Sequence, residues 1–418
     1  MPGDMQGSQQ LVRGECKMPG GKLVAVSVTI SCEPASEVSA VRMVHCQIDG
    51  DFFLESVDRQ EDLVEDLDQC IVSMTFPLEA PVVEGALARV LQEHKGVELI
   101  GASARTLTLA LLRALEQADV PAGAIRAYGP LSPLAQGQQA PELYRDLDQE
   151  HRHVFQKRWR ALPLQIVVDR PRQPAQEVAL DAALAQAVCE GREPATLRIW
   201  NWASPAVVIG RFQSLSNEVH LQTAERLGFS VVRRVSGGGA MFARPEHVIT
   251  YSLYTPAQFA QGLNHLWTYR LCDWWLIESL NHLGIEAGWS GMNDIASSQG
   301  KIGGAAERRF PGRAGEPGAL LHHDMLSYDI DTDTMMQVLN VSQEKMADKA
   351  VRSARSRVAP LKGQTALSRS QLLTALLAYL PTLAPKAHLA RLGEQVEQAG
   401  RQLAAERFSQ VQWTADIV

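Results

Sequence analysis

Two glycine-rich segments carry the residues best suited to bind an anion. The first reads Arg233-Arg234-Val235-Ser236-Gly237-Gly238-Gly239-Ala240-Met241-Phe242 and follows an apolar run. Glycines let backbone N–H groups approach an anion closely, and arginine presents a planar fork for carboxylate or phosphate. The alternative is a hairpin turn with surface arginines, and three glycines alone do not decide between the two.

The second segment, residues 293–306, places a carboxylate ahead of a lysine that lies between glycines. Asn293 and Asp294 offer the oxygen ligands that Mg²⁺ prefers, and Lys301 offers a compact charge for phosphate. Gly303 and Gly304 follow in a β-prone run. The alternative is a polar hairpin with an exposed lysine, since the segment matches neither a Walker A loop nor a dinucleotide fingerprint.

Together the two segments fit the adenylation of a carboxylic acid. A carboxylate is ionised at neutral pH, so its attack on the α-phosphate of ATP needs charge neutralisation and in-line positioning rather than an enzymic nucleophile. Arginine, lysine, Mg²⁺ and backbone amides can provide both. The acyl-adenylate then needs an amine acceptor held close, with a cation that polarises its carbonyl.

The elements that must position these segments come in mixed order, which predicts an α/β or α+β sheet domain rather than a regular βαβ alternation. Apolar, β-branched runs predict strands over residues 164–168, 197–200, 206–209, 229–235, 248–254 and 319–328. Helical patterns cover residues 142–159, 177–189 and 263–283, and a helical tail covers residues 371–380 and 389–407.

The N-terminal part predicts a separate, small α+β unit. Residues 1–12 read as a loose polar tail, followed by strands over 22–30 and 40–48. Asp58 with Glu61 resembles a capping box that opens a helix, and Ser103 can cap another helix. The proline-bearing stretch 129–141 reads as a linker. We expect domains over residues 12–126 and 159–418, joined by a linker and helix over 127–158.

Composition bounds the class of protein. A chain of 418 residues with 45% hydrophobic and 21% charged side chains is long enough for two or three globular domains. No apolar run is long enough to cross a membrane, and the polar start has no secretion signal pattern. The net charge of −7 disfavours a nucleic-acid binder, and six cysteines without a CxxC pair disfavour a zinc cluster and favour the cytoplasm.

The two segments, in this order and at this spacing, resemble those of the lipoate–protein ligase family, whose catalytic fold is shared with biotin ligases and octanoyl transferases. The resemblance covers roughly residues 160–413. Further matching stretches lie at residues 177–181, 200–219 (with Ile209-Gly210-Arg211-Phe212-Gln213), 318–321, 351–358 and 397–413.

The N-terminal unit resembles the accessory domain of the same ligases. The matching stretches are residues 17–24, Ile48-Asp49-Gly50-Asp51-Phe52-Phe53 and Leu99-Ile100-Gly101. In the family this domain is needed for adenylation and is either C-terminal or a separate subunit, whereas here it would be fused in front.

The resemblance implies ATP-dependent activation of lipoate or octanoate, followed by transfer to a lysine of an apo lipoyl-domain or lipoate-carrier protein. By matched position, Lys301 would contact the α-phosphate and the acyl carboxyl oxygens. Asn293 and Asp294 would lie by the phosphates, with Asp294 the Mg²⁺ ligand. The loop residues Arg234, Ser236, Gly237, Gly238 and Gly239 would hold the lipoyl tail and its carboxylate, and Arg211 would line the acyl pocket. Gly303 and Gly304 would belong to the substrate- or nucleotide-binding residues. In the accessory domain, Lys22, Gly50 and Asp51 would face the active site.

The chain departs from the family pattern at Ala243, Met292 and Pro317. Two rival functions are an octanoyl or lipoyl transferase and a non-catalytic lipoyl-binding scaffold. A transferase would carry a cysteine nucleophile shortly before Asn293, and residues 286–292 contain none. Cys272 lies among aromatic and aliphatic residues, which favours a buried thiol over a nucleophile. Six arginines, three of them at 308, 309 and 313 and three at 352, 355 and 357, offer either an acceptor-binding surface or a solvated face.

Overall fold

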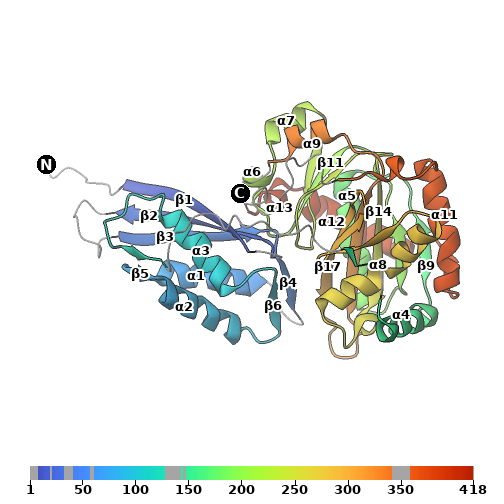
Figure 1. The fold of residues 1–418 in the computed structure, drawn as a ribbon, viewed down its shortest axis with the longest axis horizontal. Helices are drawn as coiled ribbons and strands as arrows, with labels where there is room; N and C mark the ends of the chain where they lie inside the picture. Colours follow the sequence, from blue (N-terminus) through green and yellow to red (C-terminus); the bar gives the residue numbers. More distant parts are fainter. Residues whose placement is uncertain are drawn as a thin grey trace. The chain divides into compact units, whose positions relative to one another are not determined.

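The computed structural model describes residues 8–18, 21–32, 41–56, 61–127, 143–144, 147–340 and 358–417. These residues form two compact units (Figure 1). The N-terminal unit contains the described residues up to 127 together with Phe212–Ser214, and the C-terminal unit contains the remainder. Residues 129–141, Asp58 and Arg352, Arg355 and Arg357 lie outside the described residues.

The N-terminal unit is built on an antiparallel sheet of β1 (Ser8–Lys17), β2 (Leu23–Cys32) and β3 (Val41–Gly50). The prediction of a polar tail over residues 1–12 is wrong for residues 8–12, which belong to β1. Along β1 the side of Val12, Gly14 and Cys16 faces the core. Because glycine has no apolar side chain, the sequence does not show the alternation of buried and exposed residues that is typical of a strand.

Three helices cover this sheet: α1 (Glu61–Ser73), α2 (Ala80–Glu93) and α3 (Ala104–Leu115). Leu63, Leu67 and Ile71 are buried, as their spacing predicts. Ser103 caps α3 as expected, with Thr106 in place of an acidic partner. A side chain at Gly14 would lie 2.1 Å from the carbonyl oxygen of Ala110, so this glycine permits the close approach of α3 to β1.

Two short strand pairs complete the N-terminal unit. The strand β4 (Phe53–Ser56) pairs antiparallel with β6 (Val97–Ile100). The strand β5 (Leu78–Glu79) pairs parallel with β7 (Ile125–Arg126). The predicted small α+β composition of this part of the chain is therefore confirmed.

The C-terminal unit contains a mixed sheet with the strand order β19-β9-β10-β14-β18-β17-β16-β15-β8. The predicted strands correspond to β9 (Gln165–Val168), β10 (Thr196–Ile199), β14 (Val248–Pro256) and β18 (Ala319–Ser327). The sequence reading missed β8 (Leu143–Tyr144), β15 (Ala287–Ser290), β16 (Asp294–Ser297) and β19 (His388–Leu389), which are too short for a clear periodicity. The β-prone run after Lys301 is β17 (Gly300–Phe310).

A smaller sheet has the order β12-β11-β13, with β11 (Ala206–Ile209), β12 (Ser230–Arg233) and β13 (Met241–Ala243). The strand β11 lies parallel to β12 and antiparallel to β13. The first glycine-rich segment connects β12 to β13. It therefore crosses from one side of β11 to the other.

Two buried helices cover opposite faces of the large sheet. Asp181 on α5 (Pro174–Cys189) accepts hydrogen bonds from Ser252 and Tyr254 of β14, whereas Asp273 on α8 (His265–His282) accepts one from Tyr251. Successive residues of a strand point to opposite faces, so α5 and α8 lie on opposite sides. Both helices are buried almost all round, which explains the absence of a polar stripe in their sequences.

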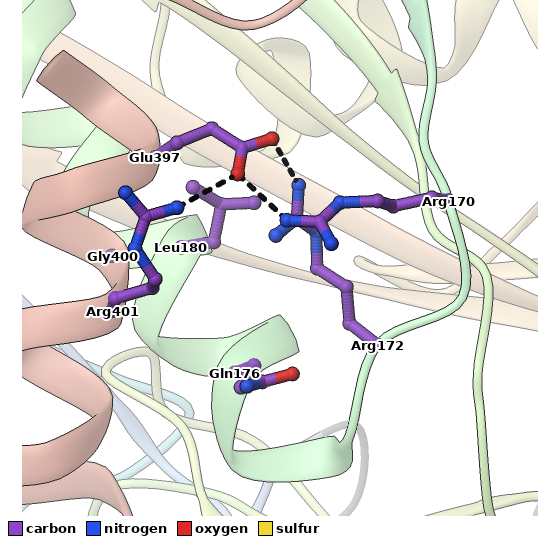
Figure 2. Close-up of a pocket in the computed structure, with 7 residues that line it drawn as sticks. All are labelled: Arg170, Arg172, Gln176, Leu180, Glu397, Gly400 and Arg401. Atoms are coloured by element: carbon purple, nitrogen blue, oxygen red, sulfur yellow. Dashed lines mark hydrogen bonds and ion pairs between the residues drawn. The ribbon is translucent and has the colours of Figure 1, made fainter. Parts of the chain in front are cut away.

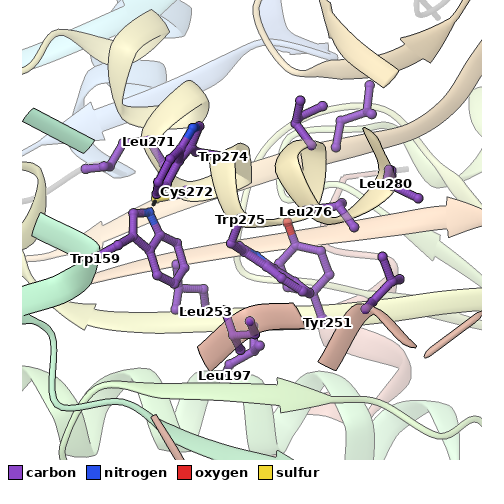
Figure 3. Packing of buried hydrophobic residues seen from close by; sticks show 14 of the residues in the cluster. Trp159, Leu197, Tyr251, Leu253, Leu271, Cys272, Trp274, Trp275, Leu276 and Leu280 are labelled. Carbon is purple, nitrogen blue, oxygen red and sulfur yellow. Dashed lines mark hydrogen bonds between the residues drawn. The ribbon is translucent and has the colours of Figure 1, made fainter. Parts of the chain in front are cut away.

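The core beneath α8 is rich in aromatic side chains (Figure 3). Trp159 of α4 (Gln149–Ala161) packs here with Trp274 and Trp275 of α8 and Tyr251 of β14. The indole Nε1 of Trp159 donates to the carbonyl of Leu271 at 2.9 Å. This satisfied polar atom lets a tryptophan lie fully buried.

The remaining helices lie around these layers. Two of them confirm the predicted tail, α11 (Arg369–Leu383) and α12 (Glu394–Leu403), and α12 continues as a π-helical turn over Ala404–Phe408. Short helices complete the unit: α6 (Leu215–Glu218), α7 (Leu221–Arg226), η2 (Ala257–Ala260), α9 (Thr332–Val338), η4 (Leu361–Gly363) and α13 (Val411–Thr414). Among the described helices none has the length and apolarity to cross a membrane.

Candidate functional site

Lys301 and Asp294 lie side by side on a β-hairpin formed by β16 and β17. Lys301 Nζ is 2.7 Å from Asp294 Oδ1. The backbone of Lys301 is fixed from the other side, because its carbonyl accepts a hydrogen bond from Ala359 N at 2.7 Å. The lysine side chain is 41% exposed, so its ammonium group remains accessible to a ligand.

Gly304 leaves the space in which this lysine lies, and Gly303 lies against β18. A Cβ at Gly304 would lie 2.9 Å from Lys301 Nζ and 3.2 Å from its Cε. A Cβ at Gly303 would lie 2.6 Å from Leu326 Cδ2 and 3.0 Å from Asp324 Oδ1. Any side chain at either position would therefore displace a neighbouring group.

Asn293 ties the loop before β16 to the middle of β17. Its side-chain Nδ2 donates to Ala305 O at 2.6 Å, and its own carbonyl accepts from Ala305 N at 2.8 Å. The structure thus brings together Asn293, Asp294, Lys301, Gly303 and Gly304, as the sequence predicts. It gives Asn293 a role in holding the hairpin.

Arg234 braces the glycine-rich loop from within. Its guanidinium group donates to the carbonyl oxygens of Val208, Gly237 and Gly239 and to Ser236 Oγ, at distances of 2.5–3.1 Å. The residue is 2% exposed. In this structure Arg234 therefore fixes the shape of the loop and does not present its charge at the surface.

A close approach between Gly210 and Gly238 joins the end of β11 to this loop. A Cβ at Gly210 would lie 2.0 Å from the carbonyl oxygen of Gly238, so only glycine fits at position 210. Gly238 has φ of +89°, a conformation that favours glycine. The carbonyl of Ser236 accepts from Arg211 N at 2.8 Å, which completes the junction.

Ser236 is the first member of a buried Ser–His–Asp chain. Ser236 Oγ lies 2.6 Å from His323 Nε2, and His323 Nδ1 lies 2.8 Å from Asp181 Oδ2. All three residues are at most 3% exposed. Sequence reasoning missed Asp181 and His323 because they come from α5 and β18, far from the loop in sequence. The adjacent His322 points to the opposite face of β18, where it contacts Asp273 of α8, so the two histidines do not share a metal site.

The direction of the hydrogen bonds in this chain follows from Asp181. Its carboxylate accepts from Ser252 and Tyr254 at 2.6 Å each. Burial lowers the pKa of His323, which favours a neutral imidazole. A neutral imidazole beside a carboxylate donates from Nδ1, so His323 Nε2 accepts the hydroxyl proton of Ser236. Ser236 Oγ in turn accepts from Arg234 Nε at 3.0 Å.

The C-terminal segment of the protein contacts two arginines that lie next to the glycine-rich loop, Arg211 and Arg233. Arg233 donates to the carbonyl oxygens of Gly210 and Arg211 and to those of Thr414 and Ile417. Arg211 forms an ion pair with Asp416, and its guanidinium lies 4.8 Å from the ring centre of Trp413. The predicted acyl-pocket residue Arg211 is thus directed to the C-terminal segment. Arg233, which the sequence reading left without a role, holds that segment to the loop.

The predicted residues of the N-terminal unit cluster at one turn. Gly50 N donates to Phe212 O at 2.9 Å, and Asp51 Oδ1 accepts from Gln213 Nε2 at 2.8 Å. Lys22 Nζ lies 5.3 Å from the ring centre of Phe53. Residues 212–214 count with this unit, so the turn and its partners form one local structure.

A small pocket of about 130 Å³ lies elsewhere in the C-terminal unit (Figure 2). Glu397 of α12 accepts hydrogen bonds there from Arg170, Arg172 and Arg401. No predicted site residue lines this pocket. The ion network connects α12 to Arg170 and Arg172.

Both glycine-rich segments are connected to the paired strands β17 and β18. Lys301 of the second segment lies on β17, and Ser236 of the first segment forms a hydrogen bond with His323 of β18. A cation between glycines and a rigid loop of backbone amides neutralise charge without supplying a nucleophile. Such an arrangement is suited to acyl-transfer chemistry on a substrate with an anionic group.

Comparison with known proteins identifies the family. Residues 173–380 match the model of the lipoyl protein ligase A/B catalytic domain. Lipoate-protein ligase A subunit 1 of Thermoplasma acidophilum is 26% identical over 258 residues, covering 60% of this chain and 96% of its own. The octanoyltransferase LipM of Halalkalibacterium halodurans is 24% identical over 275 residues, covering 58% and 95%.

The fold comparison agrees. A solved structure of the bi-partite lipoate protein ligase of Thermoplasma acidophilum superposes with a TM-score of 0.52 at 25% identity, covering 61% of this chain and 96% of that chain. A structure of lipoate-protein ligase A bound with ATP gives 0.50 at 22% identity, covering 61% and 98%. The chain belongs to the lipoyl protein ligase A/B family, an enzyme family of lipoate–protein ligases and octanoyltransferases.

Proposed function

We propose that this chain is an ATP-dependent lipoate–protein ligase. It activates lipoate or octanoate as the acyl-AMP and then transfers the acyl group to a lysine of a lipoyl-domain or lipoate-carrier protein. The observation that carries the proposal is the half-exposed Lys301 beside Asp294, in the space left by Gly304. This arrangement suits an anionic substrate that reacts without an enzymic nucleophile.

Lys301 neutralises charge in both half-reactions. In the first, the substrate carboxylate oxygen attacks the α-phosphorus of ATP and pyrophosphate leaves, while the ammonium group stabilises the charge on the equatorial oxygens. In the second, the same ammonium polarises the acyl carbonyl as the acceptor lysine attacks and AMP leaves. Asp294 holds Lys301 in position at 2.7 Å before substrate binds.

The glycine-rich loop binds the acyl substrate in this proposal. Arg234 spends its donors on the loop carbonyls, so it acts as a positioning residue for Gly237, Gly238 and Gly239. The hydroxyl group of Ser236 donates its hydrogen bond to His323. Its oxygen can therefore accept a hydrogen bond, but the group cannot also donate one to a substrate carboxylate. The backbone N–H groups of the glycines are then the donors available to the substrate.

Mg²⁺ fits the residues of the hairpin. In nucleotide sites this ion takes one or two protein carboxylates and completes its shell with phosphate oxygens and water. Asp294 supplies such a carboxylate next to Lys301, with Asn293 adjacent. When bound, the ion neutralises the phosphate charge of ATP.

An octanoyltransferase is the second candidate, since relatives of that name match this chain over 58% of its length. Those enzymes, as the family resemblance implies, pass the acyl group through a cysteine thioester. Residues 286–292, where the resemblance would put the nucleophile, contain no cysteine. Burial raises the pKa of the Cys272 thiol well above its usual value, so in the absence of a bound metal ion this residue is not a ready nucleophile. These features support the ligase.

The N-terminal unit is the accessory domain in this proposal, with the boundaries 12–126. The Thermoplasma acidophilum relative is named as a subunit of its ligase and covers only 60% of this chain, so the remaining part has room for the function of a second subunit. Cys16, Cys46, Cys70, Cys189 and Cys272 are free cysteines. A cytoplasmic location is part of this proposal.

Acid-dependent exchange of pyrophosphate into ATP tests the proposal. The purified chain should catalyse the exchange with lipoate or octanoate and not with biotin. A chain that exchanges with none of the three acids is not an acyl-adenylate-forming ligase. An exchange with biotin alone would place it with the biotin ligases instead.

A further inference from the structure

The buried cluster around His322 has the composition of a metal site. Cys272 lies on α8, Glu307 on β17 and His322 on β18. One ligand atom from each lies within 4.8 Å of the other two, and all three residues are buried. Thiolate, carboxylate and imidazole are the donors that zinc takes in proteins, whereas Mg²⁺ takes oxygen.

His322 is already oriented as zinc-bound histidines are. Its Nδ1 lies 2.9 Å from Glu307 Oε1, and its Nε2 lies 2.7 Å from Asp273 Oδ1. A metal bound by Nδ1 and Glu307 leaves Nε2–H to donate to Asp273. A carboxylate that accepts the second N–H of a metal-bound histidine fixes its tautomer and raises its basicity. Asp273 is therefore a positioning residue for this site.

The charges of the cluster also call for a cation. Asp273, Glu307 and Asp324 are each at most 2% exposed. Within the described part of the chain, the following carboxylate oxygens have no hydrogen-bond partner: Oδ1 and Oδ2 of Asp324 and Oδ2 of Asp273. Buried carboxylates without partners are costly. His322 contacts Asp273 and Glu307, and neither of these contacts reaches the carboxylate of Asp324.

We propose that Cys272, Glu307 and His322 bind a zinc ion that ties α8 to β17 and β18. Ligand atoms of a tetrahedral zinc site lie roughly 3.4–3.8 Å apart, given bonds of about 2.0–2.3 Å. A spread of up to 4.8 Å needs only a small closure of the three side chains. Cys272 belongs to the aromatic core beneath α8, which also contains Tyr251 and Trp159 (Figure 3). The ion would connect three elements of this core, and the site does not rest on the proposed function.

Metal analysis of the full-length, untagged chain tests this site. The chain is unfolded, refolded with excess Zn²⁺ or Co²⁺ and separated from free metal by gel filtration. We expect about one zinc ion per chain by mass spectrometry, and with Co²⁺ a thiolate-to-metal charge-transfer band. A refolded wild-type chain without stoichiometric zinc or without this band overturns the proposal, whatever the activity.

Three variants locate the ion. Cys272→Ser should lose the charge-transfer band, whereas Cys189→Ser, which changes another buried cysteine, should retain both band and zinc. Asp273→Asn should keep the band but lose zinc to a chelator at about 10–100-fold lower concentration. A band that persists in Cys272→Ser or disappears in Cys189→Ser assigns the metal elsewhere. Because the wild-type measurement is decisive alone, a variant that fails to fold does not remove the test.

Discussion

Lys301 and Ser236 differ in how they are prepared for a ligand. The side chain of the lysine is 41% exposed, and its ammonium group forms an ion pair with Asp294 that a charged substrate can exchange for its own oxygens. Ser236 is buried, and both of its neighbours, Arg234 and His323, are themselves fixed. The lysine is therefore suited to interact with charge that changes during a reaction. The serine is suited to hold the glycine-rich loop in a fixed conformation.

Replacement of Lys301 should abolish acid activation. We expect Lys301→Ala to lower the rate of pyrophosphate exchange by roughly 10²–10³-fold, the usual loss when one charge-stabilising donor is removed. Lys362→Ala is a matched control, because Lys362 forms a similar pair with Asp329 at 2.6 Å outside the site. Exchange that survives in Lys301→Ala would remove this lysine from the mechanism.

Replacement of Asp181 should disturb the glycine-rich loop from a distance. In Asp181→Asn an amide N–H₂ would face the hydroxyl groups of Ser252 and Tyr254. We expect a loss of about 1–3 kcal/mol in the free energy of unfolding, measured in urea, and a raised KM for the acid. Asp331→Asn should leave both unchanged, since asparagine also caps helices well. If Asp181→Asn is destabilised but its KM for the acid is unchanged, the hydrogen-bond chain of Ser236, His323 and Asp181 has only a structural role.

The hairpin of β16 and β17 shows which parts of the site could be predicted from the sequence. Asn293, Asp294 and Lys301 lie close in sequence, so their proximity follows from the turn between them. The partners of Ser236 could not be found this way, because Asp181 and His323 meet it only when α5 and β18 pack against the loop. For the same reason the cluster of Cys272, Glu307 and His322 has no recognisable spacing.

Gly304 tests how this hairpin positions the lysine. A methyl group at this position would lie within 3.2 Å of the lysine Nζ and Cε and would push the ammonium group away. We expect Gly304→Ala to fold and to lose about 10–100-fold in exchange rate, in line with the cost of a misplaced catalytic group. Gly363→Ala serves as the control, because a Cβ there meets nothing within 4 Å. Equal rates for both variants would mean that the lysine position is not limiting.

At the scale of the whole molecule, the proposed function gives the N-terminal unit a part in adenylation. The family resemblance implies this part, because the accessory domain of these ligases is needed for that step. The turn at Gly50 and Asp51 packs tightly against its surroundings, since a Cβ at Gly50 would lie 2.2 Å from Leu23 O. This rigidity suits a turn that contributes to a site.

A combined Lys22→Ala and Asp51→Ala variant separates the two steps. We expect it to lose at least about tenfold in pyrophosphate exchange and to retain transfer from presynthesised lipoyl-AMP. Arg126→Ala, which breaks the exposed pair with Glu79 in the same unit, should affect neither step. Equal losses in both steps would show that the N-terminal unit does not act on adenylation alone.

The intact mass of a lipoyl-domain acceptor distinguishes the ligase from the transferase most directly. The acceptor is incubated with the full-length chain and either lipoate with ATP and Mg²⁺ or an octanoyl-carrier thioester without ATP. The ligase predicts a mass increase of one lipoyl group, only with the free acid and only with ATP. An octanoyl increase from the thioester without ATP, and none from lipoate with ATP, would contradict it.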